Sequence, residues 1–244
     1  MGGAPRKKIG ILQPVYLPWL GYFEQMALTD LFVHFDTVQH TRRDWRNRNR
    51  IVMGGREQLL TVPTRKAPLE TPITQVEISY EQTWQKKHLK QLRLAYGSAP
   101  HFQPLYDEIA EVIEAAPRYL WELDTRLVAV MARHLGITTP TAFASEVPGQ
   151  SEDKNQRIID ICKHFGADLL YDGKSAEEFI DMERFAENGI EVIFQDYQHP
   201  VYPQGKGAFL SHMSALDLLF RQGGAAAREV MLSSPVPAVM EPGG

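Results

Sequence analysis

The chain has little cysteine and no apolar segment of membrane-spanning length. Its single cysteine, Cys162, lies in a helical pattern, so an intramolecular disulfide and a cysteine-based zinc site are both excluded. A small core residue is the simplest interpretation of Cys162. No hydrophobic run approaches the length of a transmembrane helix, and residues 1–8 form a short basic stretch without an apolar region. We therefore expect a soluble, cytoplasmic protein with no membrane partner.

The chain also lacks a basic excess, because its formal net charge is −4. Nucleic-acid-binding domains generally carry such an excess, so any anion site must arise from local charge. A Walker A loop, a Gly-x-Gly-x-x-Gly fingerprint and a Gly-x-Ser-x-Gly elbow are absent. Their absence argues against a P-loop ATPase, a dinucleotide oxidoreductase and a serine hydrolase. The histidines are too scattered for a recognisable metal spacing, so we expect no structural metal.

The length and the apolar content suit one large domain. With 244 residues, 43% of them hydrophobic, the chain can hold an α/β domain with an inserted subdomain. Strand and helix patterns alternate near both ends, whereas the middle is helical, which predicts a Rossmann-like α/β fold with a mainly parallel sheet and a helical insertion or cap. The expected boundaries are 1–80 for a first α/β half with the substrate-binding loop, 81–138 for the insertion, 139–232 for the second half and 233–244 for a flexible tail.

The expected elements follow hydrophobic periodicity. Strands are predicted at 8–13, 30–36, 73–79, 141–145, 167–173 and 190–197, and a hairpin at 51–64. Helices are predicted at 19–28, 81–96, 102–115, 119–135, 152–165, 176–188 and 211–222. Gly166 and Gly189 each follow an expected helix, at a position where glycine commonly ends one.

The most informative segment is residues 9–23. An apolar strand pattern ends in a turn with Pro14 and Pro18 on either side of Tyr16, and a helical pattern follows at once. The prolines fix φ, so the turn is stiff before any ligand binds. Helices that begin at the carboxyl edge of a sheet offer N–H groups where α/β proteins bind anions and nucleotides. Gln13 and Tyr16 are therefore candidate binding residues; the alternative is a buried proline–aromatic turn without chemistry.

Residues 41–50 concentrate arginine in an otherwise acidic chain, with five arginines in nine residues. Arginine forks match phosphate oxygens, interleaved asparagines can bond phosphate, sugar or base edges, and an indole offers a stacking face. The candidates for substrate or phosphate binding are Trp45, Arg46, Asn47, Arg48 and Arg50. The alternative is a solvated charged loop.

Polar residues also follow two of the expected strands. Asp36 and Gln39 stand where the second strand ends, and Asp36 is a candidate proton acceptor or a simple Asx turn. His199 and Tyr202 follow the last strand, and His199 is a candidate general base near neutral pH. Asp217 lies in an apolar helix and needs a partner, for which a basic residue or a histidine such as His199 is the obvious candidate.

Two expected helices open with basic residues. Lys87 and His88 can reach a phosphate or act in proton transfer, although a lone helical histidine is more often structural. Lys154 and Arg157 lie one turn apart, a spacing that suits either an anion clamp or two surface charges.

A series of different short motifs extends along nearly the whole chain. The first are Gln13-Pro14-x-Tyr16-Leu17-Pro18-Trp19-Leu20-Gly21-Tyr22, Asp36-x-Val38-Gln39 and Asn47-Arg48-Asn49-Arg50-Ile51. They are followed by Trp84 with Lys87-His88, residues 157–162, Gly173, Gln195 with His199-Pro200-Val201-Tyr202, and residues 214–220. This set, from about residue 8 to 223, resembles the WbqC-like protein family.

The resemblance implies an amino-acid transferase. Family members occur in bacterial surface-polysaccharide clusters, with a proposed transfer of glycine or another amino acid to an amino sugar. Phage relatives are associated with hypermodified thymine, where an amino-acid amine replaces the phosphate of a 5-phosphomethyl-pyrimidine in DNA. On this basis Arg46, Arg48 and Arg50 would hold phosphate, and Asp36 or His199 would take the amine proton. Trp45 or Tyr16 would stack on a base, and no cofactor is required.

Three hypotheses follow. The density of the Arg/Asn loop, with Lys7, Lys8, Lys86, Lys87 and Lys90 as a possible basic strip, favours DNA as the acceptor of a glycine transferase. The acidic net charge favours the second hypothesis, a nucleotide-linked amino sugar as acceptor. The third is a nucleotide-binding or nucleic-acid-binding module without turnover. The identity of the base among Asp36, His88 and His199 stays open.

Overall fold

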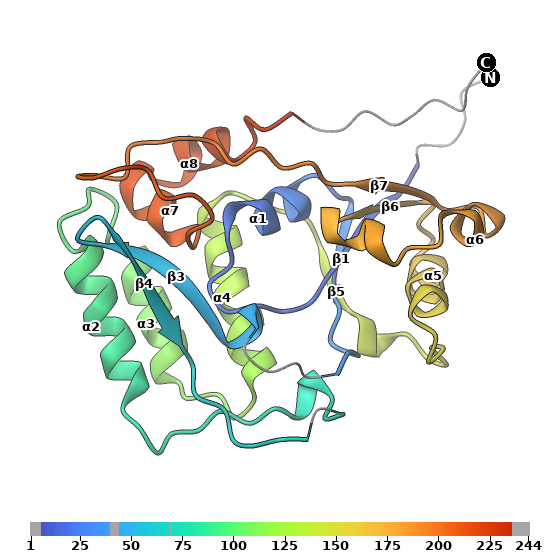
Figure 1. The fold of residues 1–244 in the computed structure, drawn as a ribbon, viewed down its shortest axis with the longest axis horizontal. Coiled ribbons are helices and arrows are strands. Elements are labelled where there is room, and N and C mark those ends of the chain that lie inside the picture. Colours follow the sequence, from blue (N-terminus) through green and yellow to red (C-terminus); the bar gives the residue numbers. More distant parts are fainter. Residues whose placement is uncertain (1–5, 40–43, 69, 236–244) are drawn as a thin grey trace.

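A five-stranded parallel sheet forms the centre of the protein (Figure 1). The computed structural model describes residues 6–39, 44–68 and 70–235. The strands, in the spatial order β5-β2-β1-β6-β7, are β1 (Lys8–Leu12), β2 (Leu31–His34), β5 (Thr141–Phe143), β6 (Leu169–Asp172) and β7 (Glu191–Phe194). Helices separate most of these strands along the chain, so the predicted Rossmann-like α/β fold is confirmed.

Apolar side chains project from both faces of the sheet, and helices cover both faces. On one face, Ile9, Ile11 and Leu170 belong to the same buried cluster as residues of α5 (Lys154–His164) and α6 (Met182–Glu187). On the other face, α1 (Leu20–Ala27) runs beside the sheet, and Tyr171 packs with Leu28 at its end. The alternation of apolar positions along each strand therefore sets a three-layer arrangement.

The order of the strands reverses at β1. The chain passes from β1 to β2 on one side, and later returns to β6 on the other side of β1. In open α/β sheets, such a reversal leaves a crevice at the carboxyl ends of the two strands, because the following segments diverge. The residues that follow β1 and β6 are therefore brought to one crevice.

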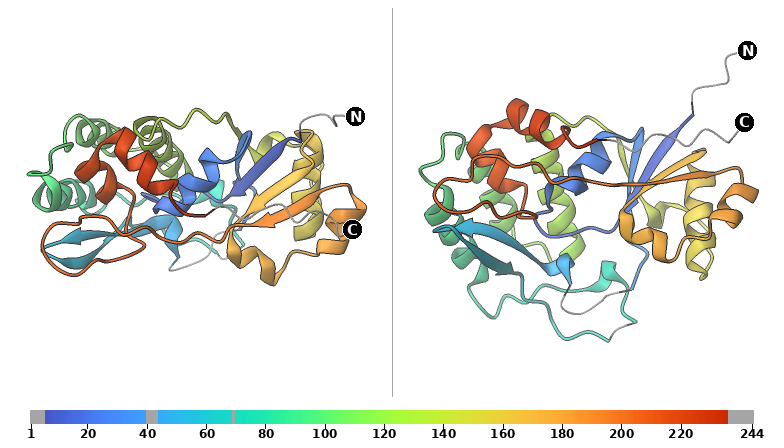
Figure 2. Two further views of the ribbon diagram at one scale, coloured as in Figure 1. Left: turned by 90° about the horizontal axis from the view of Figure 1, so that it is seen from above. Right: turned by 45° about the horizontal axis from the view of Figure 1, so that its top comes forward.

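A second body lies at one end of the sheet (Figures 1 and 2). It contains α2 (Trp84–Tyr96), α3 (Leu105–Glu114), α4 (Leu120–His134), α7 (Leu216–Gln222), α8 (Gly224–Met231) and the hairpin of β3 (Arg48–Met53) and β4 (Arg56–Thr61). One continuous apolar cluster joins Leu20 of α1 to Leu92, Leu127 and Phe220 of these helices. The segment between β7 and α7 runs along the hairpin, where the Ser214 N–H donates to the Arg50 carbonyl at 2.8 Å (Figure 2).

Within the described residues, four short 3₁₀ turns connect the larger elements. They are η1 (Trp45–Asn47), η2 (Ile73–Gln75), η3 (Ala144–Glu146) and η4 (Lys174–Glu178). The sequence predicted a strand at 73–79, which was wrong: the segment holds η2 and makes only isolated bridges, Thr64 to Ile78 and Glu77 to Tyr119. The segment crosses between the hairpin and α4, where no neighbouring strand offers a continuous partner.

Two expected helices also differ. The helix predicted at 176–188 divides into η4 and α6, because Asp181 starts a new helix by accepting a hydrogen bond from the Arg184 N–H. The helix predicted at 211–222 begins only at Leu216, since His212 has φ +58°. Gly223, with φ +76°, ends α7 as expected, but α8 follows it directly and was not predicted.

Most of the expected tail (236–244), together with Arg42 and Arg43, lies outside the described residues.

Asn49 holds the turn between β1 and α1. Its Nδ2 donates to the carbonyls of Tyr16 (3.1 Å) and Leu17 (2.8 Å), and Leu17 has φ +46°. Asn49→Ala leaves both buried carbonyls without this donor, so we expect a loss of about 2–3 kcal/mol in the free energy of unfolding. Asn188→Ala removes two hydrogen bonds at the half-buried end of α6, one to the Arg184 carbonyl and one from the exposed Lys163, and should cost less than about 1 kcal/mol. Urea denaturation measures both, and equal losses would contradict this role of Asn49.

Candidate functional site

A cleft of about 790 Å³ opens at the carboxyl edge of the sheet, where the strand order reverses. Gln13 follows β1, Asp172 to Ala176 end and follow β6, and Gln195 to Tyr197 follow β7. Tyr22 and Gln25 of α1 line one wall, and Lys154 of α5 lines another. The remaining wall comes from the second body through Trp45, Arg46 and Arg50. The cleft therefore lies where the two bodies of the protein meet.

The arginine-rich segment reaches the cleft through a short turn. Arg46, only 6% exposed, donates hydrogen bonds to the Asp44 carboxylate and to Oε1 of Gln13. Trp45 is 47% exposed, and the Arg50 guanidinium lies 4.8 Å from the centre of its ring. Arg50 also pairs with Glu57 at 3.0 Å. The segment therefore offers an open indole face flanked by cations.

Asp172 is the most perturbed carboxyl group of the cleft lining. It is 7% exposed at the last position of β6, and its Oδ1 accepts a hydrogen bond from the Gly173 N–H at 2.7 Å. Burial raises the pKa of Asp172 to about 6, while that hydrogen bond and the charge of Lys154 oppose the rise. A carboxyl group with this pKa is mostly ionised at pH 7 and can still take up a proton. Such perturbed groups concentrate at functional sites.

Lys154 opens α5 and faces the same cleft as Asp172. Burial lowers the pKa of Lys154, and the ammonium lies 3.0 Å from the centre of the Phe179 ring. The neighbouring Lys174, also in the cleft, pairs with Glu177 at 2.8 Å. These two lysines add positive charge on the side of the cleft opposite the second body.

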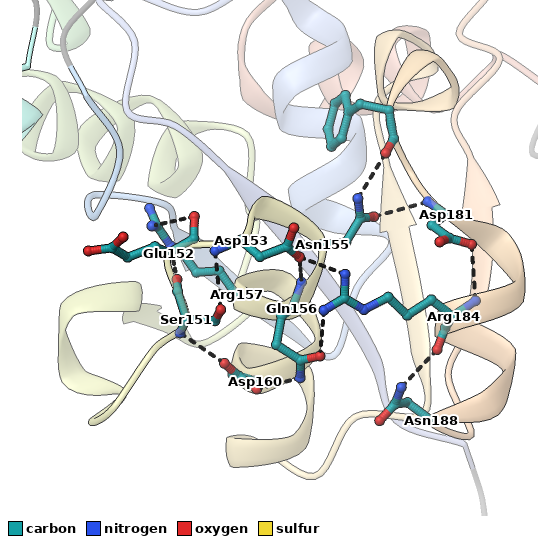
Figure 3. A network of polar contacts seen from close by, with 11 residues as sticks. Ser151, Glu152, Asp153, Asn155, Gln156, Arg157, Asp160, Asp181, Arg184 and Asn188 are labelled. Atoms are coloured by element: carbon teal, nitrogen blue, oxygen red, sulfur yellow. Dashed lines mark hydrogen bonds and ion pairs between the residues drawn. The ribbon is translucent and has the colours of Figure 1, made fainter.

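Arg157 does not join Lys154 in the cleft. Figure 3 shows it within the polar network around the start of α5. Its guanidinium donates to the carbonyls of Ser151 (2.8 Å) and Thr37 (2.9 Å). In the same network Arg184 of α6 pairs with Asp153, the N-cap of α5, at 2.7 Å. This network fixes the first turn of α5, and with it the position from which Lys154 reaches the cleft.

An aromatic cluster closes one corner of the cleft. Trp19 packs against Tyr197, with ring centroids 5.3 Å apart, and against His212 at 5.2 Å. His199 lies behind them, 6.4 Å from Trp19, outside the cleft lining, and burial lowers its pKa. The sequence left either a basic residue or a histidine such as His199 as the partner of Asp217, and the partner is the basic one: the buried Asp217 accepts a hydrogen bond from Arg221 at 3.0 Å. This basic partner lies one turn along the same helix and binds Oδ1 of Asp217.

The other predicted residues lie outside the cleft lining. His88 is buried with its Nδ1 3.0 Å from the hydroxyl of Tyr16, and burial lowers its pKa to about 4. Asp36 accepts hydrogen bonds from the Ser145 N–H and hydroxyl, at 2.9 and 2.6 Å. The rest are Gln39, which bridges to Pro72; Asn47, which donates to the Val62 carbonyl; Arg48, 6.0 Å from the Trp45 ring; Lys87, exposed on α2; and Tyr202, 3.3 Å from Gln204.

The structure thus brings together Gln13, Trp45, Arg46, Arg50 and Lys154 among the residues that the sequence singled out. Sequence reasoning missed Asp172, Lys174 and Gln195. Asp172 carried a usable signal, since it follows the apolar run 169–171 and precedes a glycine, as a residue at a strand's carboxyl end does. Gln195 stood near the end of the last expected strand and in one of the motifs that carry the family resemblance, but it was not singled out as a site residue.

Comparison with known proteins assigns the family. The WbqC-like protein family matches residues 13–229, which include all of the cleft lining except Ile11 and Leu12. The chain belongs to the WbqC-like family. It is also 35% identical over 223 residues to the uncharacterized protein Rv1507c of Mycobacterium tuberculosis, covering 90% of this chain and 96% of that protein. No solved structure matches the chain.

The described helices include none long and apolar enough to cross a membrane. The chemistry of the cleft follows from the side chains that line it. It combines one carboxyl group that titrates near pH 6, several cations and an exposed indole, a set suited to binding an anionic substrate and moving a proton.

Gly21 gives a test of the cleft's shape. A Cβ at this position would lie 2.3 Å from the Trp19 ring, which is held by Tyr197 and His212. Gly21→Ala should displace the indole, shift tryptophan fluorescence and weaken ligand binding in the cleft by about tenfold or more. Gly173→Ala is the matched control, because it lines the same cleft, has an ordinary φ of −65° and would meet no atom within 4 Å. Equal binding by the two variants would contradict this packing role.

Proposed function

We propose that the protein is a transferase in which the amine of an amino acid, most simply glycine, displaces phosphate from a phosphate-activated acceptor. The nitrogen forms a bond to the acceptor carbon, the carbon–oxygen bond to phosphate breaks, and phosphate leaves with the electron pair. The ammonium proton passes to a base on the protein. The single observation that carries the proposal is the Asp172 carboxyl group, with pKa about 6, in one cleft with Lys154 and Arg46. Membership of the WbqC-like family supports it.

Asp172 is the proposed base. Its pKa of about 6 leaves it ionised at pH 7. Because this pKa lies closer to pH 7 than that of an ordinary aspartate, Asp172 is a stronger base toward an ammonium group. The role that the sequence gave to Asp36 or His199 passes to Asp172 in this proposal, because Asp172 alone of the three lines the cleft.

Lys154, Lys174 and Arg46 are the proposed phosphate ligands. Charge builds on the leaving phosphate as the bond breaks, and cations held in place stabilise that charge. Arg46 is fixed in advance by Asp44 and Gln13, so it needs little reorganisation when phosphate leaves. Trp45 offers an exposed face on which a pyrimidine base can stack.

The favoured acceptor is a 5-phosphomethyl-pyrimidine, presented as a single nucleotide or in DNA. The lysines expected to extend the arginine loop into a strip do not support a long groove. Lys7 and Lys8 stand at the amino end of β1 and the cleft at its carboxyl end, whereas Lys86, Lys87 and Lys90 lie on α2, at the far end of the molecule from α5 (Figure 1). This separation favours a small acceptor and keeps the nucleotide-linked amino sugar as the second candidate. Both acceptors place the reaction in the cytoplasm.

The substrate assay compares three acceptors with isotopically labelled glycine. They are 5-phosphomethyl-deoxyuridine monophosphate, a DNA strand that contains the same base, and a nucleotide-linked amino sugar. We expect phosphate release and a labelled base with the first acceptor, with or without the second. Labelled sugar alone would move the proposal to the second candidate. Binding of a nucleotide without product from any acceptor would replace the transferase with a binding module.

Asp172→Asn tests the base. In the wild type, kcat/KM should rise with pH and level off above about 6, because the carboxylate is the active form. The variant should lose about 100-fold or more in activity and lose this titration. A variant that keeps both the rate and the pH profile would contradict the assignment.

The same variant has an expected effect on stability. Burial raises the folded-state pKa of Asp172 above its unfolded value, so ionising it costs stability as pH rises through 4 to 6. Asp172→Asn should therefore be more stable than the wild type at pH 8, by up to about 3 kcal/mol, with no gain at pH 4. Thermal unfolding at the two pH values measures this difference, and a gain at pH 4 alone would contradict the burial argument.

A further inference from the structure

Two glutamines line the same cleft as Asp172. Gln25 lies on α1 and is 1% exposed, and Gln195 follows β7 directly and is 5% exposed. Buried amide groups are normally hydrogen-bonded, and the partners they select decide whether nitrogen or oxygen faces a ligand.

The orientation of Gln195 is fixed by acceptors on its inner side. Its Nε2 lies 2.7 Å from the Gly21 carbonyl oxygen and 2.5 Å from Oε2 of Glu24. A carbonyl and a carboxylate oxygen only accept, so the amide nitrogen must face them and spends both of its hydrogens there. Oε1 of Gln195 is left as an acceptor, and no donor among the described residues reaches it.

Gln25 is oriented by the same logic. Its Nε2 donates to the Tyr171 carbonyl at 2.5 Å, so its Oε1 also points away from that strand and receives no hydrogen bond from the described part of the chain. Neither amide oxygen is sealed from solvent. The cleft therefore contains two acceptor-only oxygens from different elements.

Glu24 is the residue that sets this arrangement. It is 1% exposed on α1, accepts from the Tyr171 hydroxyl at 3.0 Å and from Gln195, and contacts no other side-chain donor among the described residues. Both glutamines also bind the end of β6. The backbone N–H of Gln195 donates to the Asp172 carbonyl at 2.7 Å, and the side chain of Gln25 donates to the Tyr171 carbonyl.

We propose that Gln25 and Gln195 form the binding site for the amine of the donor substrate, and that Glu24 is a positioning residue that turns the Gln195 oxygen toward it. The inference rests on the proposed function, in which the amine belongs to an amino acid. An ammonium group has three N–H donors. One proton passes to Asp172, the two glutamine oxygens accept the remaining two N–H groups, and the lone pair freed by deprotonation is left to attack the acceptor carbon.

The test separates the amine site from the acceptor site. Gln195→Met keeps the length of the side chain but removes the oxygen that accepts a hydrogen bond. Glu24→Gln removes the carboxylate that fixes the orientation of the Gln195 amide. Both should raise the KM for glycine by about tenfold and change the KM for the phosphorylated acceptor by less than twofold. Gln58→Met, a glutamine on β4 outside the cleft lining, is the matched control and should change neither constant. Thermal unfolding establishes which variants are folded, and Gln25→Met replaces any variant that is not.

A binding measurement keeps this inference distinct from the proposed function. By NMR titration without acceptor, the wild type should bind glycine more tightly than glycolate, in which a hydroxyl replaces the amine, and the variants should lose that preference. If no acceptor is turned over but this loss is seen, the amine site stands and the transferase proposal fails. If glycine is transferred and the variants keep the wild-type KM for glycine and the preference over glycolate, the amine site is overturned and the transferase proposal stands.

Discussion

The parallel pairing of β1 with β2 on one side and with β6 on the other is the constraint on which the rest of the structure depends. It makes β1 the point where strand order reverses, and it brings Gln13 and Asp172 to the same edge of the sheet although they are far apart in the sequence. The pairing of β6 with β7 adds Gln195 to that edge. A change in this order would separate the groups that line the cleft, whatever their individual chemistry.

The second body completes the site by covering the open side of that edge. Its hairpin is joined to the turn before α1 through Asn49, and the η1 turn directly before β3 carries Trp45 and Arg46 into the cleft. The apolar cluster that includes Leu20 and Leu127 keeps α1 and α4 together, so the wall that carries α1 cannot move independently of the helices behind it. One apolar core thus holds two parts of the site together: the wall at α1, which is rich in hydrogen-bond acceptors, and the cation-rich segment at η1.

Much of the fold follows from local sequence, but only part of the site does. Apolar runs identified all five sheet strands, and the stretch before Trp19 identified the crevice, because both signals are local. Residues 73–79 have the composition of a strand, yet strand formation requires a neighbour that only the tertiary structure supplies or withholds. Trp45, Arg46 and Lys154 were found because positive charge and an indole are conspicuous. Asp172 was missed although its place at a strand end was visible, because its raised pKa comes from burial. Gln195 was not singled out because its orientation is imposed by Glu24 and Gly21, which no single-residue pattern encodes.

The most direct test of the central claim, that substrate binds where the strand order reverses, is hydrogen exchange with and without glycine and 5-phosphomethyl-deoxyuridine monophosphate. We expect slower exchange of backbone amides at residues 12–22, 172–176 and 194–197, which end or follow β1, β6 and β7 around the cleft, and no change in α2. Protection confined to α2 around Lys87 and His88, with the three strand ends unchanged, would contradict it.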